Sequence, residues 1–245
     1  MTSAYGDTHR LFLQASIAER IFSETAAEEM YRKACEATSV EHDTEDFDDF
    51  MAALNDRLHR VDMEFRKSHD EENGDTVWAL VNTNGDEVAK LATEYSPNEI
   101  AFFKRILELI VTADAEAFSV SSISALREGP LLKPQITKTA AEELLQKFVD
   151  DKWLIRSSSG RYSLSTRAIL ELQGLLKEEF EDYILECTLC YEIVTKGQRC
   201  KTANCKARFH NHCAEVYYNR SNNNKACPVC STEWTGKHLI GEKAK

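Results

Sequence analysis

The 245-residue chain lacks the features that mark membrane-spanning and secreted proteins. Its longest apolar stretch, residues 106–111, contains Glu108 and falls far short of the ~20 residues that a bilayer-spanning helix needs. The start, Met-Thr-Ser-Ala-Tyr-Gly-Asp, has neither the basic beginning nor the apolar run of a signal peptide, so we expect an intracellular protein with no membrane contact. With 42% hydrophobic and 29% charged residues, the composition is that of an ordinary globular protein with one to three domains.

A surplus of basic residues is also missing from most of the chain. Residues 187–245 contain ten Lys or Arg and four Glu, a formal charge of +6. The first 186 residues contain 20 basic and 37 acidic residues, a formal charge of −17, and the two parts together give the net −11. Because phosphate binding depends on Lys and Arg, this acidic part predicts protein partners rather than general nucleic-acid binding.

Cysteine is nearly absent before residue 187. Cys35 lies there alone, in a helical pattern beside Met30 and Tyr31, and is predicted to be a core residue rather than a nucleophile. The other seven cysteines and one histidine form four closely spaced pairs: Cys187 with Cys190, Cys200 with Cys205, His210 with Cys213, and Cys227 with Cys230. Eight thiolate and imidazole ligands predict two four-coordinate zinc sites that are structural, because no position is left for an activated water.

The ligand order, four cysteines, one histidine and three cysteines, resembles that of the RING and PHD families of cross-braced zinc fingers. The resemblance implies that the first and third pairs hold one ion and that the second and fourth pairs hold the other. His212 is a rival to His210, but its position directly before Cys213 makes a poorer ligand loop.

Two features favour the RING family over the PHD family. PHD fingers usually have an aromatic residue two positions before the last ligand pair, where this chain has Lys225. The run Cys-Pro-Val-Cys at 227–230 resembles the last loop of a ubiquitin-ligase RING, and the resemblance makes Leu189, Pro228 and Tyr217 candidate contacts for an E2 ubiquitin-conjugating enzyme. Each has a structural alternative: the proline can stiffen a turn, the leucine can belong to the core, and the tyrosine can pack on the helix after Cys213. Many RING ligases carry Arg or Lys directly after the last cysteine, where this chain has Ser231, so weak intrinsic activity is expected.

Hydrophobic periodicity before the zinc-ligand cluster predicts the same order twice, three helices followed by a β-hairpin, which is the order of a winged helix and gives an α+β fold. The first set is predicted at 8–21, 25–37 and 46–60, with hairpin strands at 61–65 and 77–81. The second is predicted from Pro97 to Ile110, at 120–127 and at 138–152, with strands at 153–156 and 161–164, followed by a helical connection over 172–185. Capping-box patterns mark three starts: Ser96 with Glu99, Thr139 with Glu142, and Thr25 with Glu28.

Winged helices often bind DNA through the third helix and the wing. Both third helices of this chain are rich in acidic residues, which repel phosphate. Arg156 and Arg161 on the second hairpin could make a DNA contact, which we expect to be weak or indirect. Docking to other proteins is therefore the preferred interpretation of both winged helices.

Tandem winged helices followed directly by a RING-like finger with this ligand order resemble, over nearly the full length, the non-structural maintenance of chromosomes element 1 family. The resemblance implies a nuclear, chromatin-associated subunit of an SMC complex that acts in DNA repair and recombination. It also implies a MAGE-family partner at the winged helices, a kleisin subunit, and an E3 ubiquitin ligase activity that depends on the MAGE partner. The competing hypothesis is a non-enzymatic assembly scaffold. The expected domains are a first winged helix at 1–90, a second at 91–182, the RING-like finger at 183–236 and a tail at 237–245.

Overall fold

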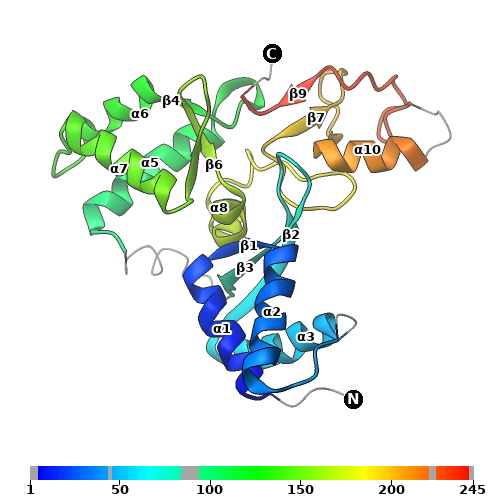
Figure 1. Cartoon of the computed structure of the whole chain (residues 1–245). Coiled ribbons are helices and arrows are strands. Elements are labelled where there is room, and N and C mark those ends of the chain that lie inside the picture. Colours follow the sequence, from blue (N-terminus) through cyan, green and yellow to red (C-terminus); the bar gives the residue numbers. More distant parts are fainter. Residues whose placement is uncertain (1–4, 44–45, 84–93, 221–224, 243–245) are drawn as a thin grey trace. The chain divides into compact units, whose positions relative to one another are not determined.

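The computed structural model describes residues 5–43, 46–83, 94–220 and 225–242, which fall into two compact units (Figure 1). The first unit comprises residues up to 70 together with 75–87. The second comprises 71–74 and the chain from 88 onward. The domain boundary that the sequence predicts between 90 and 91 lies outside the described residues.

The first unit has the three helices and three-stranded antiparallel sheet of a winged helix, with strand order β1-β3-β2. Its elements are α1 (Asp7–Glu19), β1 (Ile21–Ser23), α2 (Glu24–Thr38), α3 (Phe47–Leu58), β2 (Met63–His69) and β3 (Thr76–Asn82). The strand β1 is not predicted by the sequence. It pairs with β3, so that Phe22 lies opposite Trp78.

An aromatic core holds this unit together. Phe12 is fully buried, and its ring makes edge contacts with Phe50 at 5.3 Å and with Phe65 at 5.9 Å between ring centroids. Cys35 is fully buried in the same core, as the sequence predicts. Helix α2 begins differently from the prediction: the Ser23 hydroxyl, rather than a Thr25 capping box, accepts the hydrogen bond from the Ala26 backbone N–H.

The second unit begins with a second winged helix, whose sheet has the order β4-β6-β5. Its elements are α5 (Pro97–Val111), β4 (Val120–Ser121), α6 (Ser122–Glu128), α7 (Lys138–Asp150), β5 (Leu154–Arg156) and β6 (Arg161–Leu164). The capping box at Ser96 is confirmed, because its hydroxyl accepts from the Glu99 N–H while the Glu99 carboxylate accepts from the Ser96 N–H. The predicted capping box at Thr139 is wrong, since Thr137 caps α7 by accepting from the Ala140 N–H.

The predicted helical connection over 172–185 is only partly helical. Two short helices, α8 (Thr166–Glu171) and α9 (Gln173–Glu179), lead out of the second winged helix, and the chain turns at Phe180–Tyr183 instead of continuing as a helix. The zinc-ligand region then contributes β7 (Gly197–Arg199), β8 (Arg208–Phe209), α10 (Asn211–Arg220) and β9 (Leu239–Ile240). The strand β9 pairs with β7, so the sheet of this region extends beyond residue 236 into the segment that the sequence predicts to be a tail.

Candidate metal centre

The structure brings the eight predicted ligands together as two groups of four. Cys187, Cys190, His210 and Cys213 form the first zinc group, and Cys200, Cys205, Cys227 and Cys230 form the second zinc group. Within each group the ligand atoms all lie within 4.8 Å of one another. The sequence order of the pairs alternates between the groups, which is the cross-braced arrangement that the resemblance implies.

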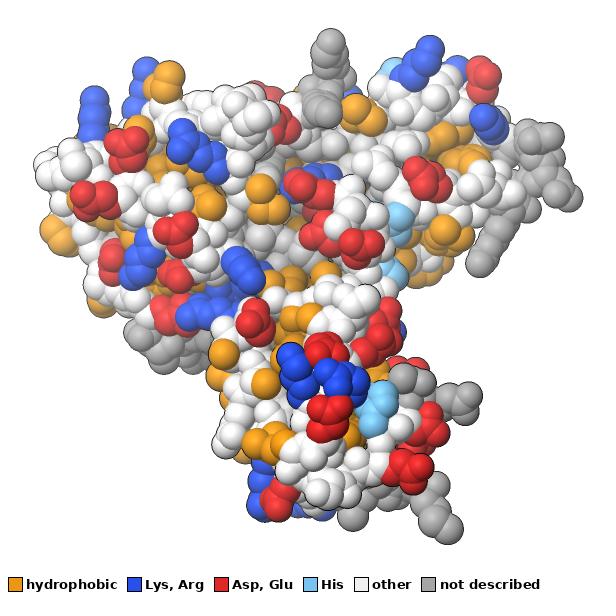
Figure 2. All heavy atoms as spheres, viewed as in Figure 1, with side chains coloured by type: hydrophobic (Ala, Val, Ile, Leu, Met, Phe, Trp, Pro, Cys, Tyr) orange, Lys and Arg blue, Asp and Glu red, His pale blue; other side chains and the backbone are white. Residues whose placement is uncertain are grey.

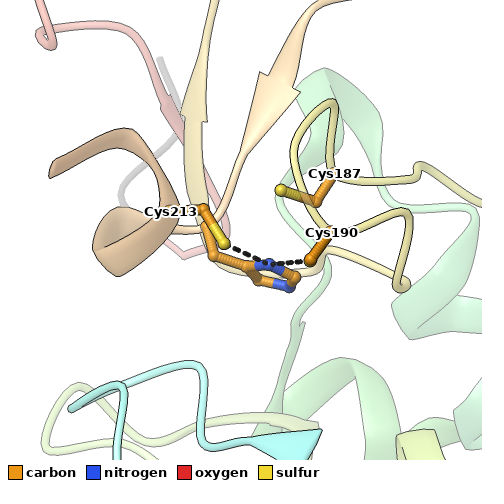
Figure 3. Close-up of side chains that lie close together, drawn as sticks. Cys187, Cys190 and Cys213 are labelled. Atoms are coloured by element: carbon orange, nitrogen blue, oxygen red, sulfur yellow. Dashed lines mark hydrogen bonds between the residues drawn. The ribbon is translucent and has the colours of Figure 1, made fainter. Parts of the chain in front are cut away.

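The geometry fits zinc. Zn–S bonds of ~2.3 Å in a tetrahedron place neighbouring sulfur atoms ~3.8 Å apart. The Sγ atoms of Cys205 and Cys227 are 3.7 Å apart, and those of Cys200 and Cys230 are 3.5 Å apart. In the first zinc group the sulfur atoms point toward one another (Figure 3), and Nδ1 of His210 lies 3.4 Å from Sγ of Cys190. The two groups therefore fit two structural zinc ions.

The loops that carry the first and the last ligand pair have the same backbone conformation. The residue after each pair, Tyr191 or Ser231, has a positive φ, and its N–H donates to the carbonyl of the first cysteine of the pair at 2.9 Å. The remaining two pairs rest on regular structure. Cys200 and Cys205 lie between β7 and β8, while His210 directly precedes α10 and Cys213 lies in its first turn.

His212 does not join either group. Its ring stacks on that of His210, with centroids 5.1 Å apart and an interplanar angle of 7°. His210 is buried, and its Nε2 lies 3.0 Å from the carbonyl oxygen of Ile193, which leaves Nδ1 facing the cysteines. The structure thus selects His210 as the histidine of the first zinc group.

The ligand thiols, which bind zinc as thiolates, have pKa values shifted in both directions by their surroundings. A hydrogen bond with the Thr232 hydroxyl lowers the pKa of Cys230 to about 5. Hydrogen bonds with Cys190 and Cys213 lower the pKa of Cys187 well below its ordinary value. Burial acts the other way in the second zinc group, where it raises the pKa of Cys205 to about 12 and the pKa of Cys227 above its ordinary value.

The three candidate E2 contacts differ in exposure. Leu189 is 37% exposed, and Pro228 is exposed in the equivalent loop of the second zinc group. Tyr217 is half-buried, with its ring 5.3 Å from that of the fully buried Phe209. Val229, which no sequence motif marks as a contact, is 57% exposed and holds the same place in its loop as Leu189. Two apolar side chains at matching loop positions thus face solvent.

One face of the molecule and one arginine of the second wing bear on DNA binding. On the face shown in Figure 2, acidic and basic side chains are interspersed rather than gathered into a basic patch. Arg161 donates from Nε to the Ser119 hydroxyl at 2.9 Å and from Nη2 to the Ser119 carbonyl at 2.7 Å. This arginine of the second wing is therefore engaged within its own domain. Among the described residues, no helix combines the length and apolar character needed to cross a bilayer.

Fold and metal groups together define a class: tandem winged helices joined to a RING-like zinc domain. Residues 9–172 match the family model described as "Nse1 non-SMC component of SMC5-6 complex", and residues 187–230 match the RING-like domain model. The chain belongs to the Nse1 family.

Relatives and a solved structure agree with this assignment. Over 96% of this chain and 85% of its own length, the non-structural maintenance of chromosomes element 1 homolog of Xenopus laevis is 33% identical. The human homolog is 32% identical over 93% of this chain and 84% of its own, and that of Schizosaccharomyces pombe is 27% identical over 96% and 95%. A chain of a solved structure titled "Nse1-Nse3-Nse4 complex" superimposes with a TM-score of 0.83 at 33% identity, covering 95% of this chain and 98% of that chain.

Proposed function

We propose that this chain is the Nse1 subunit of an SMC5-6 complex, where it assembles with Nse3, a MAGE-family protein, and Nse4, a kleisin. The similarity to a chain of an Nse1-Nse3-Nse4 structure over 95% of the present chain supports this assembly. The acidic first 186 residues and the engaged Arg161 favour protein docking over DNA binding. The proposed location is the nucleus, on chromosomes, with a role in DNA repair and recombination.

Within that complex, the RING-like domain acts as an E3 ubiquitin ligase that depends on the MAGE partner. The observation that carries this proposal is the exposure of Leu189 and Pro228 on the two matching loops, one at each zinc group. An E2 enzyme bound there presents its ubiquitin thioester to a substrate lysine. The lysine amine attacks the thioester carbonyl and the E2 thiolate leaves, so the ligase contributes orientation and needs no nucleophile of its own.

Ser231 supports the dependence on a partner. It occupies the position after the last cysteine, where its short neutral side chain cannot make the contact to ubiquitin that Arg or Lys makes in many RING ligases. Its positive φ places it at the turn of the loop. A bound partner that holds ubiquitin from another side would supply the missing restraint.

The test is discharge of ubiquitin from a preloaded panel of E2 enzymes onto free lysine, with and without the MAGE partner. Leu189→Ala and Pro228→Ala are expected to abolish the acceleration while sparing zinc content and partner binding. Cys187→Ser is the control for loss of the first zinc group. No acceleration in either state, with two zinc ions per chain confirmed, would contradict the ligase proposal.

The alternative is an assembly scaffold whose zinc domain supports subunit interfaces. The zinc domain already braces another domain within this chain, because the Arg208 guanidinium donates two hydrogen bonds to the Glu116 carboxylate of the second winged helix. Under this hypothesis, Leu189→Ala and Pro228→Ala would change complex assembly and leave ubiquitin discharge at the level without the protein.

A further inference from the structure

The segment Glu71–Gly74, which connects β2 and β3, contacts the first zinc group and belongs to the second unit. Glu71 is only 5% exposed although it lies in a polar turn. Its Oε1 accepts from the backbone N–H of Thr195 at 2.6 Å and of Lys196 at 3.2 Å, and its Oε2 accepts from the Thr195 hydroxyl at 2.5 Å. A buried carboxylate with three donors is a built site rather than a chance surface contact.

The same carboxylate lies beside a zinc ligand. Oε1 of Glu71 is 3.4 Å from Nε2 of His210, whose other ring nitrogen faces the cysteines. The nearer acceptor for the Nε2 proton is the carbonyl oxygen of Ile193 at 3.0 Å, two residues before the Thr195 N–H that Glu71 holds. Glu71 thus acts on His210 twice, through the loop that carries its acceptor and through a negative charge beside its ring.

Gly74 provides an independent sign that the segment is fitted to this place. Its φ is +77°, and a Cβ there would lie 2.9 Å from Cβ of His212, whose ring stacks on that of His210. A side chain at position 74 would therefore both strain the turn and displace the histidine pair. The approach of this segment to the zinc group is a feature of its backbone as well as of Glu71.

We propose that Glu71 is a positioning residue for the first zinc group, which fixes the ring orientation and tautomer of His210 so that Nδ1 binds the metal. Ligand histidines usually donate their second N–H to a carboxylate or a carbonyl, and losing such a partner typically lowers metal affinity by about 10- to 100-fold. The second zinc group has no such contact with Glu71 among the described residues, so the effect is confined to one of the two ions.

The test uses the full chain and measures zinc release to a competing chelator, together with the d–d spectrum of the cobalt-substituted protein. A three-sulfur, one-nitrogen site and a four-sulfur site have different cobalt spectra, which separates the two groups. Glu71→Ala is expected to weaken the first site by up to about 100-fold and Glu71→Gln by about 10-fold, because the amide keeps the loop hydrogen bonds and loses the charge. Glu72→Gln is the matched control, since the neighbouring Glu72 carboxylate is exposed and contacts the Lys196 ammonium at 2.7 Å.

Two outcomes would overturn the proposal: affinities for both ions that stay within about twofold of the wild type in Glu71→Ala and Glu71→Gln, or equal weakening of both ions. Glu71→Gln keeps the shape of the side chain, so it remains informative if Glu71→Ala does not fold. Because the readout is metal binding, the result is independent of ubiquitin transfer. If the Glu71 variants weaken zinc binding at the first group as expected and the chain shows no ligase activity, only the ligase proposal is contradicted.

Discussion

The buried ion pair of the second winged helix gives a prediction whose size can be worked out from the structure. The side chains of Arg167 and Glu171 are 1% and 3% exposed, and Nε of Arg167 lies 2.6 Å from Oε1 of Glu171. The guanidinium also donates to the Asp151 carbonyl and lies over the Trp153 ring, with its central carbon 4.0 Å from the ring centroid. One arginine thus joins α8, the end of α7 and the start of β5.

Replacing Arg167 by Met leaves the Glu171 carboxylate buried without this cation. Breaking a buried pair in this way costs about 3–5 kcal/mol, whereas replacing both partners by apolar residues is often neutral. A unit the size of the second one, residues 71–74 with 88–245, loses about 2–4 °C in Tm per kcal/mol. The single change therefore lowers Tm by roughly 6–20 °C. The double variant Arg167→Met with Glu171→Leu is expected to recover most of that loss.

The assay is urea unfolding of zinc-loaded protein followed by tryptophan fluorescence. The chain has three tryptophans, Trp78, Trp153 and Trp234, one in each domain. A background with Trp78→Phe and Trp234→Phe leaves Trp153 to report on the second winged helix alone. A single-variant cost below about 1 kcal/mol, or a double variant whose loss equals the sum of the two single losses, would refute the reasoning.

Three further predictions concern the other parts of the molecule. Burial lowers the pKa of His9, so the unfolded state takes up the proton first as the pH falls below the ordinary pKa of about 6.5. The first winged helix is therefore expected to lose stability as the pH falls below that value. The variant His9→Gln should make the midpoint of urea unfolding depend less on pH. Gly197→Ala would place a Cβ 2.1 Å from the carbonyl oxygen of Phe209, so zinc content should fall below two ions per chain by metal analysis; a stoichiometry unchanged from the wild type would contradict this. Glu116→Ala removes two charge-assisted hydrogen bonds from Arg208, and the zinc domain should lose about 1.5–3 kcal/mol in unfolding followed by Trp234.

Local signals in the sequence predict the elements that local physics determines. The helix from Pro97 begins at its capping box because Ser96 and Glu99 satisfy each other's backbone N–H groups within four residues. Short strands escape such reasoning: β4 has two residues, and β1 has three, too few for an alternating pattern. They exist because a distant hairpin strand offers free backbone partners, and no local pattern encodes that pairing.

The same distinction applies to the metal centre. The ligand spacing predicts the eight ligands because each loop must bring two side chains to one ion, a requirement on neighbouring residues. Glu71 is 124 residues from Thr195 in the sequence, and an acidic residue in a polar turn normally indicates solvent exposure. Its burial depends on a tertiary contact, so a single sequence carries no signal for it.

Contacts from the second winged helix reach the zinc domain at separate points in its sequence. Glu116 binds the Arg208 guanidinium through its carboxylate, and its backbone carbonyl also accepts from the N–H of Gly241, the residue after β9, at 2.9 Å. Arg208 itself donates to the Cys205 carbonyl at 2.7 Å, so the residue that holds Glu116 also supports a ligand loop of the second zinc group. A zinc domain excised at residue 183 would lose the Glu116 contacts while keeping all eight ligands. Failure of such a fragment to bind an E2 would therefore not bear on the ligase proposal, which has to be tested on the full chain.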